Sequence, residues 1–255
     1  MLPLRAFLTV ALFGGAAAML PPADARIADF ASWVARPARL PFAWQALAAA
    51  NRGGEGSEAF ARGQQILALA PSWTLGHAAF AYRYVLTQDT RGPAAAVAAQ
   101  AERRLIVALT WMERARQQAG KRELELLHSA AFLAPIACRA FPGLEDLLPP
   151  GGAAAITDAC LQEAERLSPT AAVQEQRLFH TPTLAAALLD AGERNAATEL
   201  LREASARSLQ ARDQQLAREW RARVDEVVRW LQGDEQALDA VAADPRFEPL
   251  WPHLR

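Results

Sequence analysis

The sequence predicts an all-α protein built from stacked, antiparallel helix pairs. Apolar residues recur at spacings of three and four, which places them on one face of a helix. No stretch alternates apolar and polar residues for long enough to predict a strand. Prolines and glycines interrupt the chain at intervals that suit helix–turn–helix units, and one such unit cannot bury its apolar face alone. We therefore expect successive pairs to stack into an α-α superhelix.

Residues 59–86 form the clearest of these pairs. Phe60 and Ile66 lie on one stripe of the first helix. Pro71 ends that helix, because proline lacks an amide donor and disfavours α geometry in the residue before it. Ser72 is placed to cap the second helix. That helix carries apolar and aromatic residues at spacings of three and four, namely Trp73, His77, Phe80, Ala81 and Tyr84.

The other elements follow from the same signals. Residues 26–40 are interpreted as a linker with a short helix, broken by Pro37 and Pro41. Residues 141–152, rich in proline and glycine, are the least helical stretch and are expected to be an insertion or a hinge. The expected helices cover residues 41–51, 58–70, 72–88, 93–119, 121–139, 153–167, 170–191, 193–210, 212–232 and 234–243. Pro135 and Pro182 are expected to kink or interrupt the helices that contain them.

Residues 1–25 have the pattern of a secretory signal peptide or an N-terminal membrane anchor. Arg5 precedes the uncharged apolar run of residues 6–20, and the small-residue site of residues 23–25 follows. The run is shorter than the roughly 20 residues that span a bilayer comfortably. The alternative, a buried N-terminal helix, is disfavoured by the glycines and prolines of this stretch. With the positive charge retained inside, residues 41–255 are expected outside the cytoplasm, either exported or anchored at the inner membrane with the domain in the periplasm.

The composition describes a globular chain and argues against a nucleic-acid partner. Hydrophobic residues make up 52% of the chain and charged residues 22%, which is not typical of disorder. The net charge is −1, whereas a nucleic-acid binder needs a basic excess. The arginines between residues 202 and 223 alternate with acids, as expected for ion pairs on exposed helices. Contact with a membrane is expected only through the N-terminal segment.

No pattern in the sequence predicts catalytic, cofactor or metal chemistry. Four histidines lie in four separate segments, without a second ligand at helical spacing: His77, His128, His180 and His253. Acidic pairs such as Glu145 and Asp146, or Glu163 and Glu165, are interpreted as solvated helix faces. Phosphate-binding loops and nucleophile elbows are absent. Cys138 and Cys160 either form a disulfide that pins residues 141–152 or are two small buried thiols. We therefore do not expect an enzyme.

Several segments resemble tetratricopeptide repeats, whose helix pairs recur about every 34 residues. The first match comprises Trp44, Leu47, Ala48, Ala59 and Pro71, and the second comprises His77, Phe80, Ala81 and Tyr84. A partial match covers residues 184–204, and residues 244–247 resemble the segment that follows the last helix of many such proteins. The chain departs from the pattern at Gly63, where a bulky aromatic residue is usual. The repeats are thus degenerate.

The resemblance implies a non-enzymatic, protein-binding scaffold, and the signal-like pattern of residues 1–25 leads us to expect it in a bacterial cell envelope. Its partner would be a protein or peptide held on the inner face of the stacked helices. The repeat register assigns Leu75, Ala78, Tyr82 and Val85 to that face. The alternative is an exported α-helical domain that binds a small molecule or lipid, with the helices of residues 93–139 enclosing an apolar pocket.

Overall fold

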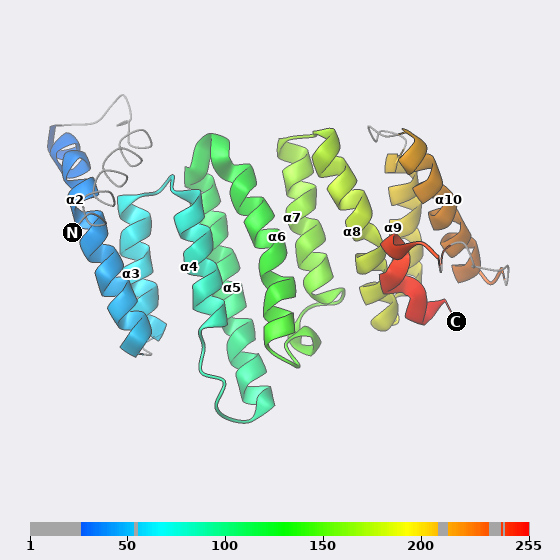
Figure 1. Ribbon diagram of the computed structural model, residues 1–255, viewed down its shortest axis with the longest axis horizontal. Helices are drawn as coiled ribbons and strands as arrows, with labels where there is room; N and C mark the ends of the chain where they lie inside the picture. Colours follow the sequence, from blue (N-terminus) through cyan, green and yellow to red (C-terminus); the bar gives the residue numbers. More distant parts are fainter. Residues whose placement is uncertain (1–26, 54–55, 209–213, 235–240, 242, 255) are drawn as a thin grey trace. The chain divides into compact units, whose positions relative to one another are not determined.

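The computed structural model describes residues 27–53, 56–208, 214–234, 241 and 243–254 (Figure 1). These residues form helices and turns and contain no strand, which confirms the prediction of an all-α protein. The α-helices are α2 (Ile27–Gly53), α3 (Gly56–Leu69), α4 (Thr74–Leu86), α5 (Ala94–Ala119), α6 (Glu123–Ala140), α7 (Gly152–Leu167), α8 (Ala171–Asp190), α9 (Arg194–Arg207) and α10 (Gln214–Leu231). Short 3₁₀ helices are η1 (Gly120–Arg122), η2 (Glu145–Leu147) and η4 (Pro245–His253).

Helix α2 differs most from its prediction. The sequence predicts a linker at residues 26–40 and a helix from Pro41, whereas one helix runs from Ile27 to Gly53. Pro37 and Pro41 both lie inside it. Proline fixes φ near the helical value, so its cost to a helix is a lost hydrogen bond and a local clash. Packing of α2 against α3 supplies contacts that offset this cost.

The prolines of α6 and α8 also lie inside helices rather than ending them. Pro135 is within α6 and Pro182 is within α8. Near the second proline, the Thr181 hydroxyl donates to the carbonyl of Arg177 at 3.1 Å. This bond has the i to i−4 geometry that Ser and Thr side chains commonly adopt in helices. The predicted helix of residues 234–243 falls largely outside the described residues.

The described chain divides into two compact units, and the first contains α2, α3, α4 and residues 103–126 of α5, η1 and α6. Its core is aromatic. The Phe80 ring lies 4.5 Å from the Trp111 ring, and Phe60 lies 5.5 Å from Trp111. At a second contact, Trp44 of α2 meets Trp73 edge to face at 5.4 Å. Tryptophans thus mark helix–helix contacts, as their spread along the chain suggests.

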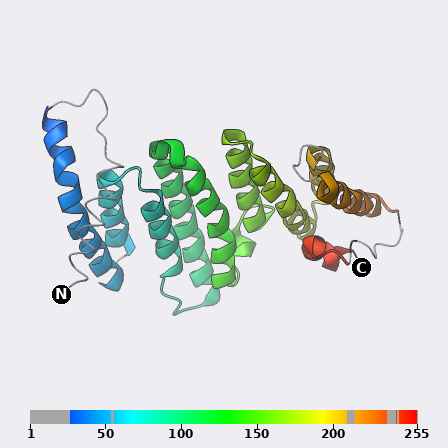
Figure 2. The ribbon, with the colours of Figure 1, turned by 45° about the horizontal axis from the view of Figure 1, so that its top comes forward.

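The second unit comprises residues 93–102 and the described residues from 127 onward. Helix α8 packs against α7, α9 and η4. Both ribbon views show the red η4 segment beside the end of α8 (Figures 1 and 2). Phe247 and Leu250 of η4 are fully buried, and Trp220 of α10 packs against Phe247. The C-terminal segment therefore completes this core.

The segment between α6 and α7 is anchored. Phe141 and Leu144 are buried within residues 141–152, where the sequence predicts an insertion or a hinge. Gly151 and Gly152 both have positive φ, which lets the chain turn into α7. A segment with buried side chains at its start and a fixed turn at its end does not suit a hinge.

The predicted signal peptide or anchor, residues 1–25, lies outside the described residues. Among the residues that are described, none of the helices combines the length and apolar character needed to cross a bilayer.

Candidate functional site

The corner between α3 and α4 is fixed by a buried histidine. His77 is 1% exposed, and its Nε2 lies 3.1 Å from the carbonyl oxygen of Ala70 and 3.3 Å from that of Pro71. Because carbonyls only accept, Nε2 must carry the proton and donate. The imidazole thereby satisfies carbonyls at the C-terminal end of α3. Burial lowers the pKa of His77, so the neutral ring is favoured.

Helix α4 starts differently from the prediction. It begins at Thr74, and the N-cap position, which the sequence assigns to Ser72, is occupied by Trp73, whose side chain makes no capping bond. The Thr74 hydroxyl instead donates to the carboxylate of Glu125 at 2.5 Å. Arg122 and Thr74 both lower the pKa of Glu125 by bonding to it. The first turn of α4 is thus tied to the first turn of α6 within the first unit.

Two glycines let aromatic rings approach the backbone closely at this corner. A Cβ at Gly63 of α3 would lie 2.5 Å from Cζ of Phe80, and a Cβ at Gly76 would overlap the ring of Trp73. Such contacts are too short for real side chains, so the rings must pack directly on the backbone. The aromatic bulk absent at Gly63 is therefore supplied by Phe80 from the facing helix.

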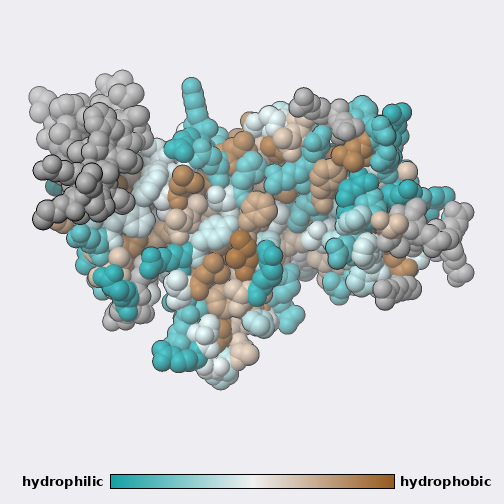
Figure 3. All heavy atoms as spheres, viewed as in Figure 1, coloured by the Kyte–Doolittle hydropathy of each residue, from teal (hydrophilic) through white to brown (hydrophobic). Residues whose placement is uncertain are grey.

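The solvent-facing side of α4 is an apolar stripe, which we call the α4 face. It comprises Leu75, Ala79, Tyr82 and Leu86, at spacings of four, three and four. Leu75 is 64% exposed and Ala79 is exposed, while Tyr82 and Leu86 are half-buried. Burial raises the pKa of the Tyr82 phenol, which therefore stays neutral. Figure 3 shows hydrophobic residues at the surface over α4.

The four residues that the repeat register assigns to a partner divide into two pairs. Leu75 and Tyr82 belong to the α4 face. Ala78 is 7% exposed and Val85 is fully buried, so packing engages both of their side chains. The residue that the register omits is Ala79, one position beyond Ala78. The role of the four assigned residues in partner binding stays a prediction. Of the four, only Leu75 and Tyr82 have side chains that a partner could reach.

The opposite side of α4 is held rigidly. Arg104 of α5 donates to the carbonyl of Tyr84 at 3.0 Å, and its guanidinium lies 5.2 Å from the centre of the Tyr84 ring. Tyr84 in turn packs on Phe60 and Phe80. A face supported in this way is preorganised, which lowers the entropy lost on binding.

The second unit contains a cluster of charged side chains from α7, α8 and α9. Arg177 donates from Nε to Asp158 at 3.1 Å and from Nη1 to Glu165 at 2.8 Å. The Arg177 side chain is only 12% exposed. Burial is the largest single influence and acts to lower the pKa of Arg177, but the two carboxylates together raise this pKa above its ordinary value. Asp158, Glu165 and Arg177 therefore form a partly buried charge network between helices.

Arg207 of α9 sits at the edge of this network and is poorly paired. Its Nη1 lies 4.0 Å from Glu165, and its Nε and Nη2 are buried without a hydrogen-bond partner. Burial and the nearby charge of Arg177 lower the pKa of Arg207. An open groove of about 380 Å³ lies beside the network, lined by Ala159, Gln162, Glu163, Glu165, Arg166 and Arg177.

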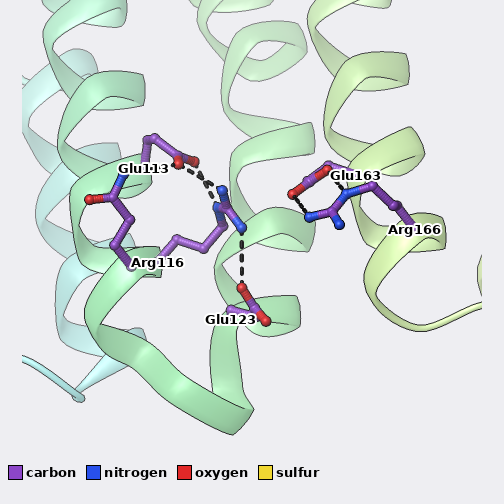
Figure 4. A network of polar contacts seen from close by, with 6 residues as sticks. Glu113, Arg116, Glu123, Glu163 and Arg166 are labelled. Atoms are coloured by element: carbon purple, nitrogen blue, oxygen red, sulfur yellow. Dashed lines mark hydrogen bonds and ion pairs between the residues drawn. The ribbon is translucent and has the colours of Figure 1, made fainter.

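Other ion pairs lie at the surface, and Figure 4 shows three of them. Arg116 of α5 bonds both to Glu113 at 2.7 Å and to Glu123 at 3.1 Å, across the turn into α6. Separately, Glu163 and Arg166 form an i,i+3 pair at 2.7 Å. Exposed pairs of this kind each contribute at most about 1 kcal/mol. They are typical of solvated helix surfaces and indicate no chemistry.

The two cysteines are free thiols. The hydroxyl of Thr157 donates to the carbonyl of Ala131 at 2.7 Å, which aligns α6 and α7 at that level. Because the helices are antiparallel, Cys138 lies about 10 Å from this level in one direction and Cys160 about 4 Å in the other. A disulfide needs Cα atoms within about 7 Å. The structure therefore contradicts the disulfide, and it leaves both thiols half-buried rather than fully buried as the other alternative expects.

Cys138 instead takes part in the turn into α7. Its thiol bonds to Glu145, and burial together with that carboxylate raises the pKa of Cys138 to about 12. Glu145 accepts from the amide of Ala153 at 2.9 Å, at the α7 N-terminus. The carboxylate fills the space where a Cβ of Gly152 would lie. Such a thiol is protonated and unreactive at neutral pH.

Metal ligands do not gather in the part of the chain that the structure describes: no three His, Cys, Asp or Glu side chains are placed to share an ion. His180 bonds to the carbonyl of Ala154 at 2.9 Å, and His253 lies 3.4 Å from Asp190.

Sequence reasoning missed the roles of Glu165 and Glu145, which it assigned to solvated faces. A signal for the first was present in α8, where Arg177 shares a helical stripe with the buried residues Val173 and Thr181. A charged residue on a buried stripe requires a charged partner nearby. No comparable signal identifies Glu145, because its partners come from a non-repetitive turn.

Comparison with known proteins found no family model, no curated protein and no solved structure that matches this chain.

Proposed function

We propose that this protein is a non-enzymatic scaffold of the cell envelope that binds a protein or peptide on the α4 face. The observation that carries the proposal is the exposed apolar stripe of Leu75, Ala79, Tyr82 and Leu86 on a helix whose other sides are packed. An exposed apolar stripe on a rigid support is a common feature of helix-binding surfaces. Isolated exposed leucines need no explanation, but a continuous helical stripe does.

Within this proposal, the helix pairs form a degenerate superhelix similar to tetratricopeptide repeats. The supporting observations are the packing of sequential helices against one another and the close corner at Pro71. The cell-envelope location rests on the signal-like pattern of residues 1–25. The non-enzymatic assignment rests on the sequence, which contains no catalytic pattern, and on the charged residues that line the groove of the second unit. Glu163 pairs with Arg166, and Glu165 pairs with Arg177.

The test is site-specific photo-crosslinking in the cell that expresses the protein. A photoreactive phenylalanine analogue replaces Leu75 in one variant and Tyr82 in another. The matched control places it at Gln118, an exposed residue of α5 that does not belong to the stripe. We expect adducts of one defined mass from the two α4 positions and none from the control. Mass spectrometry then identifies the crosslinked species.

Three results would contradict the proposal. Adducts of equal yield from Gln118 would indicate random collisions. An absence of adducts from both Leu75 and Tyr82 would remove the α4 face as a binding surface. Adducts that consist of lipid or a small molecule would favour the alternative of a lipid-binding or small-molecule-binding domain.

A further inference from the structure

We propose that the α4 face binds an amphipathic helix that carries an acidic side chain opposite Arg83. The inference rests on the proposed function and specifies the chemistry of the partner. Arg83 directly follows Tyr82 and borders the apolar stripe between Ala79 and Leu86. It is exposed, and α4 contains no acidic residue. Within α4, Arg83 is therefore the one charged residue that borders the apolar stripe.

Arg83 is one of the exposed arginines of this unit whose charge is not engaged by the described residues. Its guanidinium makes no hydrogen bond or ion pair with any described residue, since the bonds from Thr87 go to its backbone carbonyl. By contrast, five arginines of the same unit are engaged with an acid or a carbonyl: Arg62, Arg91, Arg104, Arg116 and Arg122. A cation left unpaired beside an apolar surface complements an acid on an incoming partner.

The length of the stripe suits a helix rather than an extended peptide. Leu75 and Leu86 are eleven positions apart, which corresponds to about 16 Å along the axis. Ala79, in the middle of the stripe, is small and lets a second helix approach closely. Apolar side chains spaced at three and four on the partner would meet the α4 residues spaced in the same way.

The same geometry fixes the register of the acid. Leu75 and Arg83 are eight positions apart, or about 12 Å along α4. The partner therefore needs its acid about eight positions from the apolar residue that covers Leu75. An acid about four positions from that residue would lie near Ala79 and too far from the guanidinium for an ion pair.

The experiment measures the binding of synthetic helices to the full chain by fluorescence anisotropy. Each labelled peptide has one leucine stripe and a side-chain lactam on its far face, because short free helices are marginal in water. The peptides differ only at the position eight residues from the first leucine, which is Glu, Gln or Lys. A fourth peptide places the Glu four residues from that leucine. The protein variants are Arg83→Gln, Leu75→Ser and, as the matched control, Arg114→Gln, an exposed arginine of α5.

We expect the Glu peptide in the matched register to bind about two- to fivefold more tightly than the Gln peptide at low salt. The Lys peptide and the shifted Glu peptide should bind no better than the Gln peptide. The advantage should shrink as salt shortens the screening length. Arg83→Gln should remove the advantage while leaving the Gln peptide unaffected. Arg114→Gln should retain it, and Leu75→Ser should weaken all four peptides.

Equal binding of all four peptides that is still weakened by Leu75→Ser would overturn the acidic partner and leave the proposed function in place. Loss of peptide binding altogether, with crosslinks still formed from Leu75, would also overturn the helical acidic partner. If crosslinks fail too, the proposed function fails with it. Binding of the wild-type chain to equimolar phosphatidylcholine–phosphatidylglycerol vesicles that is lost in both Leu75→Ser and Arg83→Gln would instead assign the face to a lipid surface.

Discussion

Arg177 and Arg207 are neighbours in one charge network, and the same substitution at each should have very different effects. Arg177→Met removes the guanidinium that bonds to Asp158 and Glu165. Both carboxylates are mostly covered, with exposed fractions of 14% and 21%. Breaking a buried ion pair by removing one partner costs about 3–5 kcal/mol, because the remaining charge is uncompensated. We expect a loss at the lower end of that range, because part of each carboxylate still reaches water.

Arg207→Met should lower the free energy of unfolding by less than about 1 kcal/mol, or should raise it. Its guanidinium keeps two buried donors without a partner, and each unsatisfied buried donor costs about 1–3 kcal/mol. Its contact with Glu165, at 4.0 Å, is the longest of the ion pairs in this network. Methionine would retain the apolar contacts of the arginine stem without the charge. The removed attraction and the removed desolvation cost therefore nearly cancel.

The assay is equilibrium unfolding in urea, followed by far-UV circular dichroism, for the wild-type chain and both variants. Urea is preferred because guanidinium salts would screen the charges under test. A shift of midpoint at constant slope measures the change in stability. Equal losses of stability in the two variants, or a larger loss in Arg207→Met, would refute the interpretation that Arg177 stabilises the fold through this network while Arg207 contributes little net stability.

Three further outcomes follow from single residues. Because burial lowers the pKa of His77 below its ordinary value of 6.5, the folded chain should bind fewer protons than the unfolded chain. The contribution of His77 to the free energy of unfolding is then complete above about pH 7 and is lost as the pH falls below 6.5. His77→Gln should therefore reduce the difference between the urea midpoints measured at about pH 7.5 and at about pH 5.5. Gly152→Ala should cost about 1–3 kcal/mol more than Gly120→Ala, because both have similar positive φ but only Gly152 meets a carboxylate, and thermal unfolding compares the two variants. Cys138 and Cys160 should stay free under an oxidised glutathione buffer, and Cys138 should be alkylated quickly only in urea; a loss of two protons in the intact mass would contradict the register of α6 and α7.

Much of the helical architecture could be predicted, because it depends on local signals. The corner at Pro71 and the turn at Gly192 each separate helices near the positions expected. The extent of α2 could not be predicted, since Pro37 and Pro41 carry the usual signals of a break. Packing against α3 outweighs those signals, and packing partners are not visible in a local pattern.

The α4 face could be predicted only approximately. The helical period places Leu75 and Tyr82 on one side, as the structure has them. The same period also includes Ala78 and Val85, which tertiary packing buries. The helical period identifies neighbouring residues on one side of α4, but it does not show which of them the core buries. Networks such as that of Arg177 are harder to predict, because they join side chains from three helices that are separate in the sequence.

The contact between Gly63 and Phe80 has a consequence for how this chain can change over generations. The two positions share one volume, and the ring of Phe80 occupies the part that a Cβ at Gly63 would need. Related sequences should therefore vary at the two positions together. A larger residue at position 63 becomes accessible to evolution only after position 80 has lost its ring. The historical order of substitutions at this pair is thus constrained, and reconstructed ancestors should show the smaller residue at 80 before the larger one at 63.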